Sequence, residues 1–346
     1  MKIGLIARAD KTGLGIQTKA FYDHMSPDRT LVVDLRHCSG QSPDLSLYPD
    51  AKVWHDRRYP GTEIIADPVI DQFLDGLDLV FTCETPYNYY LFQKARELGV
   101  RTVQQYNFEF LDYLHFSGLP FPDLLEAPSP WNIPVVKRKL PSVRVELLPV
   151  PVDRKLLPFQ QRSSLNKLLH IAGTPAVEDR NGTLLAIEAM KYVESPVTLT
   201  VKTQKRIPAN PPQNVHIDNS DVENYWDLYG DEDAFLFPRK FGGLSLPINE
   251  SISCGMVPIL SGCEPQTAWI PTECLVRGSV TKQIMTKTMI DIYEVSPHSL
   301  AMKIDEFYED RLSFNKLSFK MNEIGDSISW DTLKPRYISV FEGLLS

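Results

Sequence analysis

The chain has 346 residues, 43% of them hydrophobic, and a formal net charge of −8 at pH 7. This composition is that of a folded globular protein, and the length predicts two domains. The net negative charge argues against a protein that coats nucleic acid non-specifically, and no apolar run approaches the roughly 18 residues that a membrane-spanning helix needs.

The acidic excess lies in the second half of the chain. Residues 1–158 hold 18 basic and 20 acidic side chains, whereas the remainder holds 18 and 24. A local basic groove in the nearly neutral first half is therefore compatible with the overall charge.

The N-terminus, "MKIGLIARAD", predicts a first β-strand and lacks the cleavage site of a signal peptide. The five cysteines are odd in number and form no C-x-x-C pair. They predict reduced, buried thiols in a cytoplasmic protein and argue against a zinc site.

The first half alternates between strand-like and helix-like segments. Strands are predicted at 2–8, 29–35, 51–56, 77–83 and 100–107, and helices at 15–25 and 87–99. This alternation is typical of a parallel sheet wound with helices.

A second βα series follows a proline-rich stretch at 149–158, which reads as a linker. Its strands are predicted at 167–173, 197–203, 214–218, 234–238, 257–262 and 272–278, with a helix at 182–193. The expected fold class is therefore α/β, with two Rossmann-like domains.

The loop "ADKTGLGIQT" (9–18) follows the first strand and opens a helix. With Asp34 it resembles a dinucleotide fingerprint. Thr18 at the third glycine position and the long approach to Gly13 argue against a nicotinamide site. A plain turn remains an alternative, and we favour a sugar- or phosphate-binding loop that includes Gly13 and Gly15.

Four later segments resemble, in order, the GT-B glycosyltransferases, and specifically the large retaining family of nucleotide-sugar-dependent enzymes (group 1, family 4-like). These segments are 127–159, "LLHIAGTPAVEDRNGTLLAIEAMKYV" (168–193), "FLFPRKFGGLSLPINESISCGMVPILSG" (235–262) and "ISWDTLKPRYISVFEGLLS" (328–346). The resemblance implies two domains facing across a cleft. It assigns residues 1–155 to the acceptor side, 156–328 to the donor side, and 329–346 to a helix that returns to the first domain.

The resemblance also implies the donor residues. Glu250 matches the second glutamate of the family's E-x7-E motif, which binds ribose hydroxyls, and Gly242 replaces the first. Thr174 and Asn181 stand where the family has basic residues, and Arg180 could supply the missing cation. The expected donor-binding residues are Gly13, Gly15, Gly173, Thr174, Arg180, Lys202, Arg239, Lys240, Gly243, Leu244, Ser245 and Glu250.

Loops after the strands of the first half are expected to face the acceptor. Asp10, Glu84 and Glu109 are candidate catalytic carboxylates, together with the cation Arg180, and each carboxylate could instead cap its loop. Aromatic and amide side chains nearby are the candidate acceptor contacts: Tyr87, Tyr106 and Asn107.

In the usual proposal for such retaining enzymes the departing diphosphate takes the acceptor proton, so the protein needs no strong nucleophile. We therefore expect no metal and no cofactor, with a nucleoside-diphosphate sugar, most simply a UDP-sugar, as co-substrate.

The acceptor could be a small molecule, a glycan or a hydroxymethylated pyrimidine in DNA. The DNA case rests on "KRK" (137–139), "DRR" (56–58) and the aromatics of the first half. Two other classes stay open, a non-catalytic binding protein and a sugar-nucleotide epimerase. Neither membrane insertion nor an obligate protein partner is expected.

Overall fold

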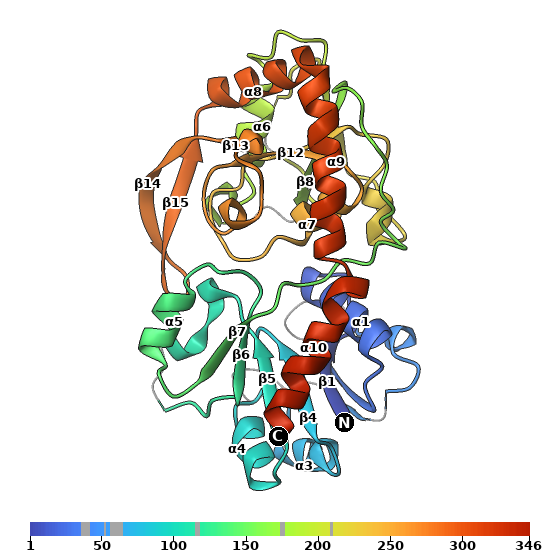
Figure 1. Ribbon diagram of the computed structural model, residues 1–346, viewed down its shortest axis with the longest axis vertical. Helices are drawn as coiled ribbons and strands as arrows, with labels where there is room; N and C mark the ends of the chain where they lie inside the picture. Colours follow the sequence, from blue (N-terminus) through green and yellow to red (C-terminus); the bar gives the residue numbers. More distant parts are fainter. Residues whose placement is uncertain (36–41, 52, 56–64, 115–117, 174–176, 208–209) are drawn as a thin grey trace. The chain divides into compact units, whose positions relative to one another are not determined.

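The computed structural model describes the chain except residues 36–41, 52, 56–64, 115–117, 174–176 and 208–209 (Figure 1). It divides into two compact units. Unit 1 is Met1–Val150 with Leu333–Ser346, and unit 2 is Pro151–Thr332. Each unit is a parallel sheet wound with helices, so the expected fold class of two Rossmann-like domains is confirmed.

Unit 1 holds a seven-stranded parallel sheet in the order β3-β2-β1-β4-β5-β6-β7. Its strands are β1 (Ile3–Arg8), β2 (Arg29–Val33), β3 (Val53–His55), β4 (Leu79–Cys83), β5 (Arg101–Gln105), β6 (Leu124–Ala127) and β7 (Arg144–Leu147). The short apolar runs become central strands because both faces are covered, as in other parallel sheets.

Helices pack on both faces of this sheet (Figure 1). They are α1 (Gly13–Met25), α3 (Asp67–Leu74), α4 (Tyr90–Glu97), α5 (Ile133–Lys139) and α10 (Trp330–Leu345). On one face Phe81 stacks on Phe21 of α1, with ring centroids 4.1 Å apart, and contacts Phe341 of α10 at 6.1 Å. On the other face a Cβ added to Gly4 would lie 2.9 Å from the Phe73 ring of α3. Functional side chains are then expected at the carboxyl edge of the sheet.

Unit 2 repeats this plan with six parallel strands in the order β10-β9-β8-β11-β12-β13. The strands are β8 (Lys167–Gly173), β9 (Thr198–Thr203), β10 (Val215–Asp218), β11 (Ala234–Phe237), β12 (Val257–Ser261) and β13 (Leu275–Val276). Helix α6 (Thr183–Ala189) packs on α8 (Pro297–Glu309), and α7 (Leu246–Ser253) packs on α9 (Arg311–Ser327).

The strands of unit 2 differ from the prediction in two places. The strand expected at 272–278 is shortened to β13, because residues 272–274 form a 3₁₀ turn. An antiparallel hairpin of β14 (Gly278–Met285) and β15 (Met289–Val295) follows it and projects from the unit (Figure 1).

The last helix, α10, begins in unit 2 and has its residues from Leu333 onward in unit 1. Its buried side chains there are Leu333, Tyr337 and Phe341. Among the described residues, no helix has the length and apolar character that would let it cross a membrane.

Candidate functional site

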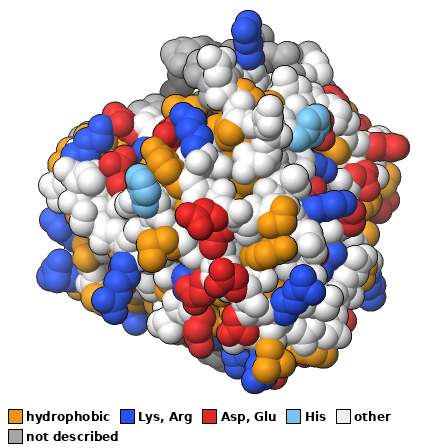
Figure 2. All heavy atoms as spheres, turned by 90° about the horizontal axis from the view of Figure 1, so that it is seen from above, with side chains coloured by type: hydrophobic (Ala, Val, Ile, Leu, Met, Phe, Trp, Pro, Cys, Tyr) orange, Lys and Arg blue, Asp and Glu red, His pale blue; other side chains and the backbone are white. Residues whose placement is uncertain are grey.

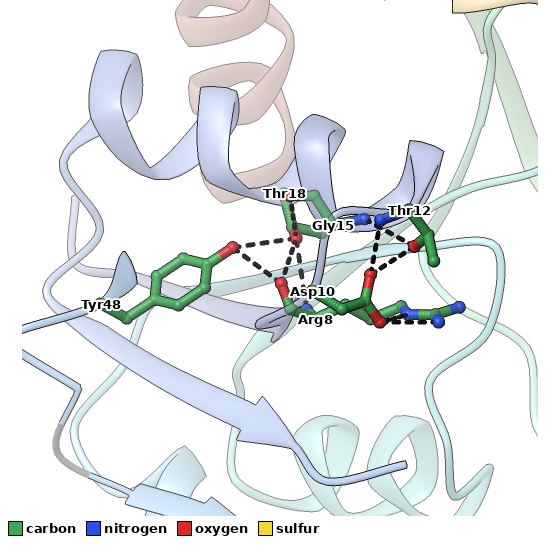
Figure 3. A network of polar contacts seen from close by, with 6 residues as sticks. All are labelled: Arg8, Asp10, Thr12, Gly15, Thr18 and Tyr48. Carbon is green, nitrogen blue, oxygen red and sulfur yellow. Dashed lines mark hydrogen bonds and ion pairs between the residues drawn. The ribbon is translucent and has the colours of Figure 1, made fainter. Parts of the chain in front are cut away.

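The loop after β1 is closed by Asp10 (Figure 3). Its Oδ2 accepts from Arg8 Nε at 2.9 Å and lies 2.7 Å from Arg8 Nη2. Its Oδ1 accepts from the Thr12 backbone N–H at 3.0 Å and from the Thr12 hydroxyl. Both carboxylate oxygens therefore hold the loop, which is how a loop-capping aspartate is placed.

The two glycines of this loop lie in the first turn of α1 rather than before the helix. Thr12 is the N-cap, and its Oγ1 accepts from the Gly15 N–H at 3.3 Å. A Cβ on Gly15 would lie 1.9 Å from the Asp10 carbonyl oxygen. Gly15 thus has a structural reason to be glycine, because the loop backbone passes directly against it.

A strained turn presents Glu84 at the carboxyl end of β4. Glu84 and Tyr87 have φ of 64° and 60°, a region that non-glycine residues seldom adopt. The turn is fixed by bonds from Glu84 N–H to the Gln105 carbonyl and from Gln104 Nε2 to the Glu84 carbonyl, both 2.7 Å. Asn107 Nδ2 donates to Glu84 Oε2 at 3.0 Å. Backbone strain that is held by its surroundings in this way is typical of functional sites.

Arg8 is a residue that the sequence analysis missed. Burial acts to lower its pKa, but the neighbouring Tyr87, Asp10 and Glu84 outweigh burial and raise it. The sequence shows only that Arg8 ends the first predicted strand; the pairing of β1 with β4 brings it near Glu84. The structure thus brings Asp10, Glu84 and Tyr87 around one guanidinium.

The remaining acceptor-side candidates are buried. Glu109 is 1% exposed in a 3₁₀ turn, so its carboxyl does not face solvent. Tyr106 is 2% exposed, and its hydroxyl has no hydrogen-bond partner among the described residues. Burial raises the pKa of Tyr106, so the hydroxyl stays protonated as a donor.

In unit 2, two arginines converge on Gly242. Gly242 has φ of 110°, and a Cβ built there would lie 2.2 Å from Arg180 Nη2 and 2.5 Å from Arg239 Nη2. Any side chain at 242 would displace these guanidinium groups. Two cations therefore lie where a side chain at position 242 would begin.

The cations of this region differ in how they are held. Arg239 is 4% exposed and donates from Nε to the Phe241 carbonyl at 2.9 Å and from Nη1 to the Gly243 carbonyl at 3.1 Å. Lys240 forms an ion pair with Glu294 of β15 at 2.8 Å. Lys202 Nζ lies 3.4 Å from the Asp227 carbonyl. Arg239 thus braces the loop that leads into α7.

Glu250 lies on α7 and is 6% exposed. Tyr229 donates its hydroxyl hydrogen to Glu250 Oε2. Burial raises the pKa of Glu250 to about 7, and the Tyr229 hydrogen bond acts against that rise. Leu244 and Ser245 immediately precede the helix, with Ser245 at the N-cap position.

The N-terminus of α6 is occupied by the chain itself. Asp179 accepts from the Thr183 N–H at 2.8 Å and the Leu184 N–H at 3.1 Å. Asn181 Nδ2 donates to the Ala172 carbonyl at 3.1 Å. Gly173, at the end of β8, has φ of 60°, and nothing lies within 4 Å of a Cβ built on it. Thr174 and residues 56–58 lie outside the described residues.

The described residues include no group of three or more histidine, cysteine or acidic side chains that could hold a metal ion. The four cysteines in this part of the chain are free thiols, and Cys38 lies outside it.

A shallow depression of about 790 Å³ lies over α8 of unit 2, away from the predicted residues. It is lined by Tyr192, Glu194, His298, Ala301, Met302, Asp305, Glu306, Glu309 and Asp310. Acidic side chains gather near the middle of the face shown in Figure 2. Asp305 binds the backbone at 194–195, and Asp310 caps α9. An acidic depression of this kind repels an anionic donor, so we place the candidate site at the sheet edges instead.

No protein-family profile and no curated protein matches this sequence. Solved structures do match it. The chain is similar to sucrose-phosphate synthase from Thermosynechococcus elongatus, with 13% identity, 99% of both chains covered and a TM-score of 0.70. It is similar to HepE from Anabaena in complex with UDP and glucose, with 11% identity, 99% and 100% covered and a TM-score of 0.69. A glycosyltransferase from Rickettsia africae gives 12% identity, 100% and 98% covered and a TM-score of 0.68. The chain therefore has the GT-B fold of these glycosyltransferases.

Proposed function

We propose that this chain is a retaining glycosyltransferase that moves a sugar from a nucleoside-diphosphate sugar to an acceptor hydroxyl. The observation that carries the proposal is the convergence of Arg180 and Arg239 on Gly242, just before the helix that bears Glu250. Two guanidinium groups match the two negative charges of a diphosphate. A carboxylate accepts hydrogen bonds from ribose hydroxyls.

The fold supports this assignment by analogy. HepE, which shares the fold over nearly the full length of both chains, is in complex with UDP and glucose. We propose UDP as the nucleotide here for that reason. Gly243, Leu244 and Ser245 are then the backbone turn beside the diphosphate, and Gly173 and Lys202 lie at neighbouring strand ends.

In the proposed reaction the bond between the sugar C1 and the diphosphate oxygen breaks, and a bond from the acceptor oxygen to C1 forms on the same face. The acceptor proton passes to the departing diphosphate. Arg180 and Arg239 stabilise the charge that grows on the diphosphate. No protein nucleophile takes part, and the expected metal independence is tested by adding a chelator.

The acceptor side is proposed for unit 1. Glu84, held by Asn107 on a strained turn, accepts a hydrogen bond from the acceptor hydroxyl. Tyr106 offers a buried hydroxyl as donor. Asp10 acts through Arg8 by keeping the loop after β1 closed. The buried Tyr87 forms part of the wall of the proposed acceptor site.

The decisive experiment is release of nucleoside diphosphate from UDP-, GDP- and ADP-sugars, with and without candidate acceptors. Release from one donor that falls by at least about 100-fold in Glu250→Ala supports a transferase. Glu84→Gln should lower transfer and leave donor affinity unchanged, since Glu84 belongs to unit 1. A folded protein that binds none of the donors would refute the proposal.

The same assay distinguishes the acceptors. Hydroxymethylated DNA is one arm, and small sugars and glycans are the others. Lys137, Arg138 and Lys139 lie exposed in the last turn of α5, so replacing all three should flatten the salt dependence of any DNA binding. Donor binding without turnover would identify a binding protein, and interconversion of the free sugar nucleotide would identify an epimerase.

A further inference from the structure

We propose that Tyr229 is a positioning residue that aims Glu250 at the nucleotide and favours its ionised form. This inference rests on the proposed function, because it gives Glu250 a nucleotide to bind. It adds a residue that neither the sequence nor the fold comparison assigns.

The contact itself is direct. Tyr229 follows the 3₁₀ turn Tyr225–Leu228, and its hydroxyl donates to Glu250 Oε2 from a segment 21 positions away in sequence. Glu250 Oε1 makes no hydrogen bond to the residues that the structure describes, so this oxygen is left for a ligand hydroxyl. Among the described residues, Tyr229 thus holds one carboxylate oxygen, and we assign the other to the nucleotide.

The chemistry of Glu250 depends on that contact. Burial raises the pKa of Glu250 to about 7, so about half of the carboxyl groups are protonated at neutral pH. The Tyr229 hydrogen bond is the interaction that lowers this pKa. Tyr229 itself stays protonated, because burial and the charge of Glu250 raise its own pKa. A permanent donor therefore favours the ionised carboxylate.

Besides Glu250, the groups that act electrostatically on Tyr229 are Cys254 and Tyr225. On α7, burial raises the pKa of Cys254 to about 12, so it remains a neutral thiol. Arg154 and Arg162 act electrostatically on Cys254 and oppose that rise. Tyr225 acts electrostatically on Tyr229 from the preceding turn.

The test is the dissociation constant of UDP from pH 5.5 to 9.5, measured by calorimetry for the wild type, Tyr229→Phe and Tyr225→Phe. The wild type should bind more tightly as pH rises through about 7, because only ionised Glu250 accepts two ribose hydrogens. In Tyr229→Phe the midpoint should move upward by about one pH unit. Binding should weaken about fivefold at pH 7 and much less at pH 9.

Tyr225→Phe is the matched control. It removes a hydroxyl from the same turn without touching Glu250, and its pH profile should be that of the wild type. An equal loss of affinity at every pH in Tyr229→Phe would mean that Tyr229 only supports the fold, and the inference would be wrong.

A second readout separates this inference from the proposed function. NMR titration of ¹³C-labelled glutamate carboxyls, with Glu250→Gln used to assign the signal, follows Glu250 in the absence of nucleotide. A higher midpoint in Tyr229→Phe supports the positioning role even if UDP is not the ligand. An unchanged midpoint overturns it even if UDP binds. Failure of wild-type protein to bind any nucleotide would count against the proposed function alone.

Discussion

The two units share one architecture and place opposite charges at the same edge of it. At the carboxyl edge of unit 1, Asp10 and Glu84 surround a single guanidinium, that of Arg8. At the corresponding edge of unit 2, Arg180 and Arg239 converge on a glycine. A parallel sheet wound with helices therefore fixes where a site lies, and the residues at the strand ends decide which charge it binds.

The interiors of the two units also differ, because unit 1 buries an acidic side chain and unit 2 a basic one. Unit 1 buries the carboxyl of Glu126, which accepts from Tyr337 at 2.8 Å and Gln105 at 3.2 Å. Unit 2 buries the imidazole of His170 between the Leu236 carbonyl at 2.8 Å and the Thr183 hydroxyl at 2.9 Å. These partners assign the proton of His170 to Nδ1. Changes in pH should therefore affect the two units differently.

The largest expected effect is that of pH on the stability of unit 1. Burial raises the pKa of Glu126 to about 8, so the folded unit prefers the neutral acid. The folded state then binds more protons than the unfolded state between pH 4.5 and 8, and the free energy of unfolding falls as pH rises, by about 5 kcal/mol in all. Glu126→Gln should abolish this fall.

Urea unfolding is carried out at each pH, and the exposed thiols are then labelled at one common pH. This measures the free energy of unfolding of each unit separately. Cys83 reports on unit 1 and Cys274 on unit 2, since both thiols are buried in the folded chain. If unit 1 of the Glu126→Gln variant loses as much stability between pH 5 and 9 as unit 1 of the wild type, the expectation is wrong.

The next largest effect is expected on the stability of unit 2 in acid. Burial lowers the pKa of His170 to about 4, so its contribution to stability is lost as pH falls from 6.5 to 4. The raised pKa of Glu250 acts in the opposite direction between pH 4.5 and 7. Replacing Glu250 with Gln should expose the His170 effect, about 3 kcal/mol, as a steeper loss of unit 2 stability in acid. Labelling of Cys274 measures the stability of unit 2 at each pH. If Glu250→Gln leaves the dependence of that stability on pH unchanged, Glu250 does not oppose the His170 effect.

A smaller effect is expected on donor binding. Arg239→Met removes one of the two guanidinium groups and should weaken UDP binding by about 2 kcal/mol, or roughly 30-fold. Lys240→Met is the matched control, because Lys240 is paired with Glu294, and it should change affinity much less. Calorimetry distinguishes the two, and equal losses would mean that the charge acts only at long range.

The smallest effect concerns the glycine between the arginines. Gly242→Ala places a methyl group against both guanidinium groups and at a φ of 110°, so UDP affinity should fall about tenfold. Gly99→Ala shares a positive φ, of 75°, but its Cβ would meet nothing within 4 Å. That variant should lose some stability and no affinity. A loss of affinity in both would show that backbone strain, and not the arginine pair, is responsible.

Sequence reasoning located most of the regular elements because apolar runs and turn residues are local signals. It missed the helices α3, α5, α8 and α9, the short strands β6 and β7 and the β14–β15 hairpin. β6 and β7 have four residues each, too few to show a period, and the hairpin is almost fully exposed on β14. It placed the start of α1 two residues late, because glycines read as loop although Thr12 caps the helix before them.

The sequence by itself determined the fold class, since apolar runs and turn residues are signals that lie close together along the chain. Only the tertiary structure decided which distant groups meet. Arg180, from the segment between β8 and α6, meets Arg239 and Gly242 in the loop after β11. Tyr229 reaches Glu250 across 21 positions, and Arg8 joins Asp10 to Glu84 across two strands. The same packing removes Glu250, Glu126 and His170 from water, and that burial sets their pKa values because a charge without solvent must find a partner or disappear.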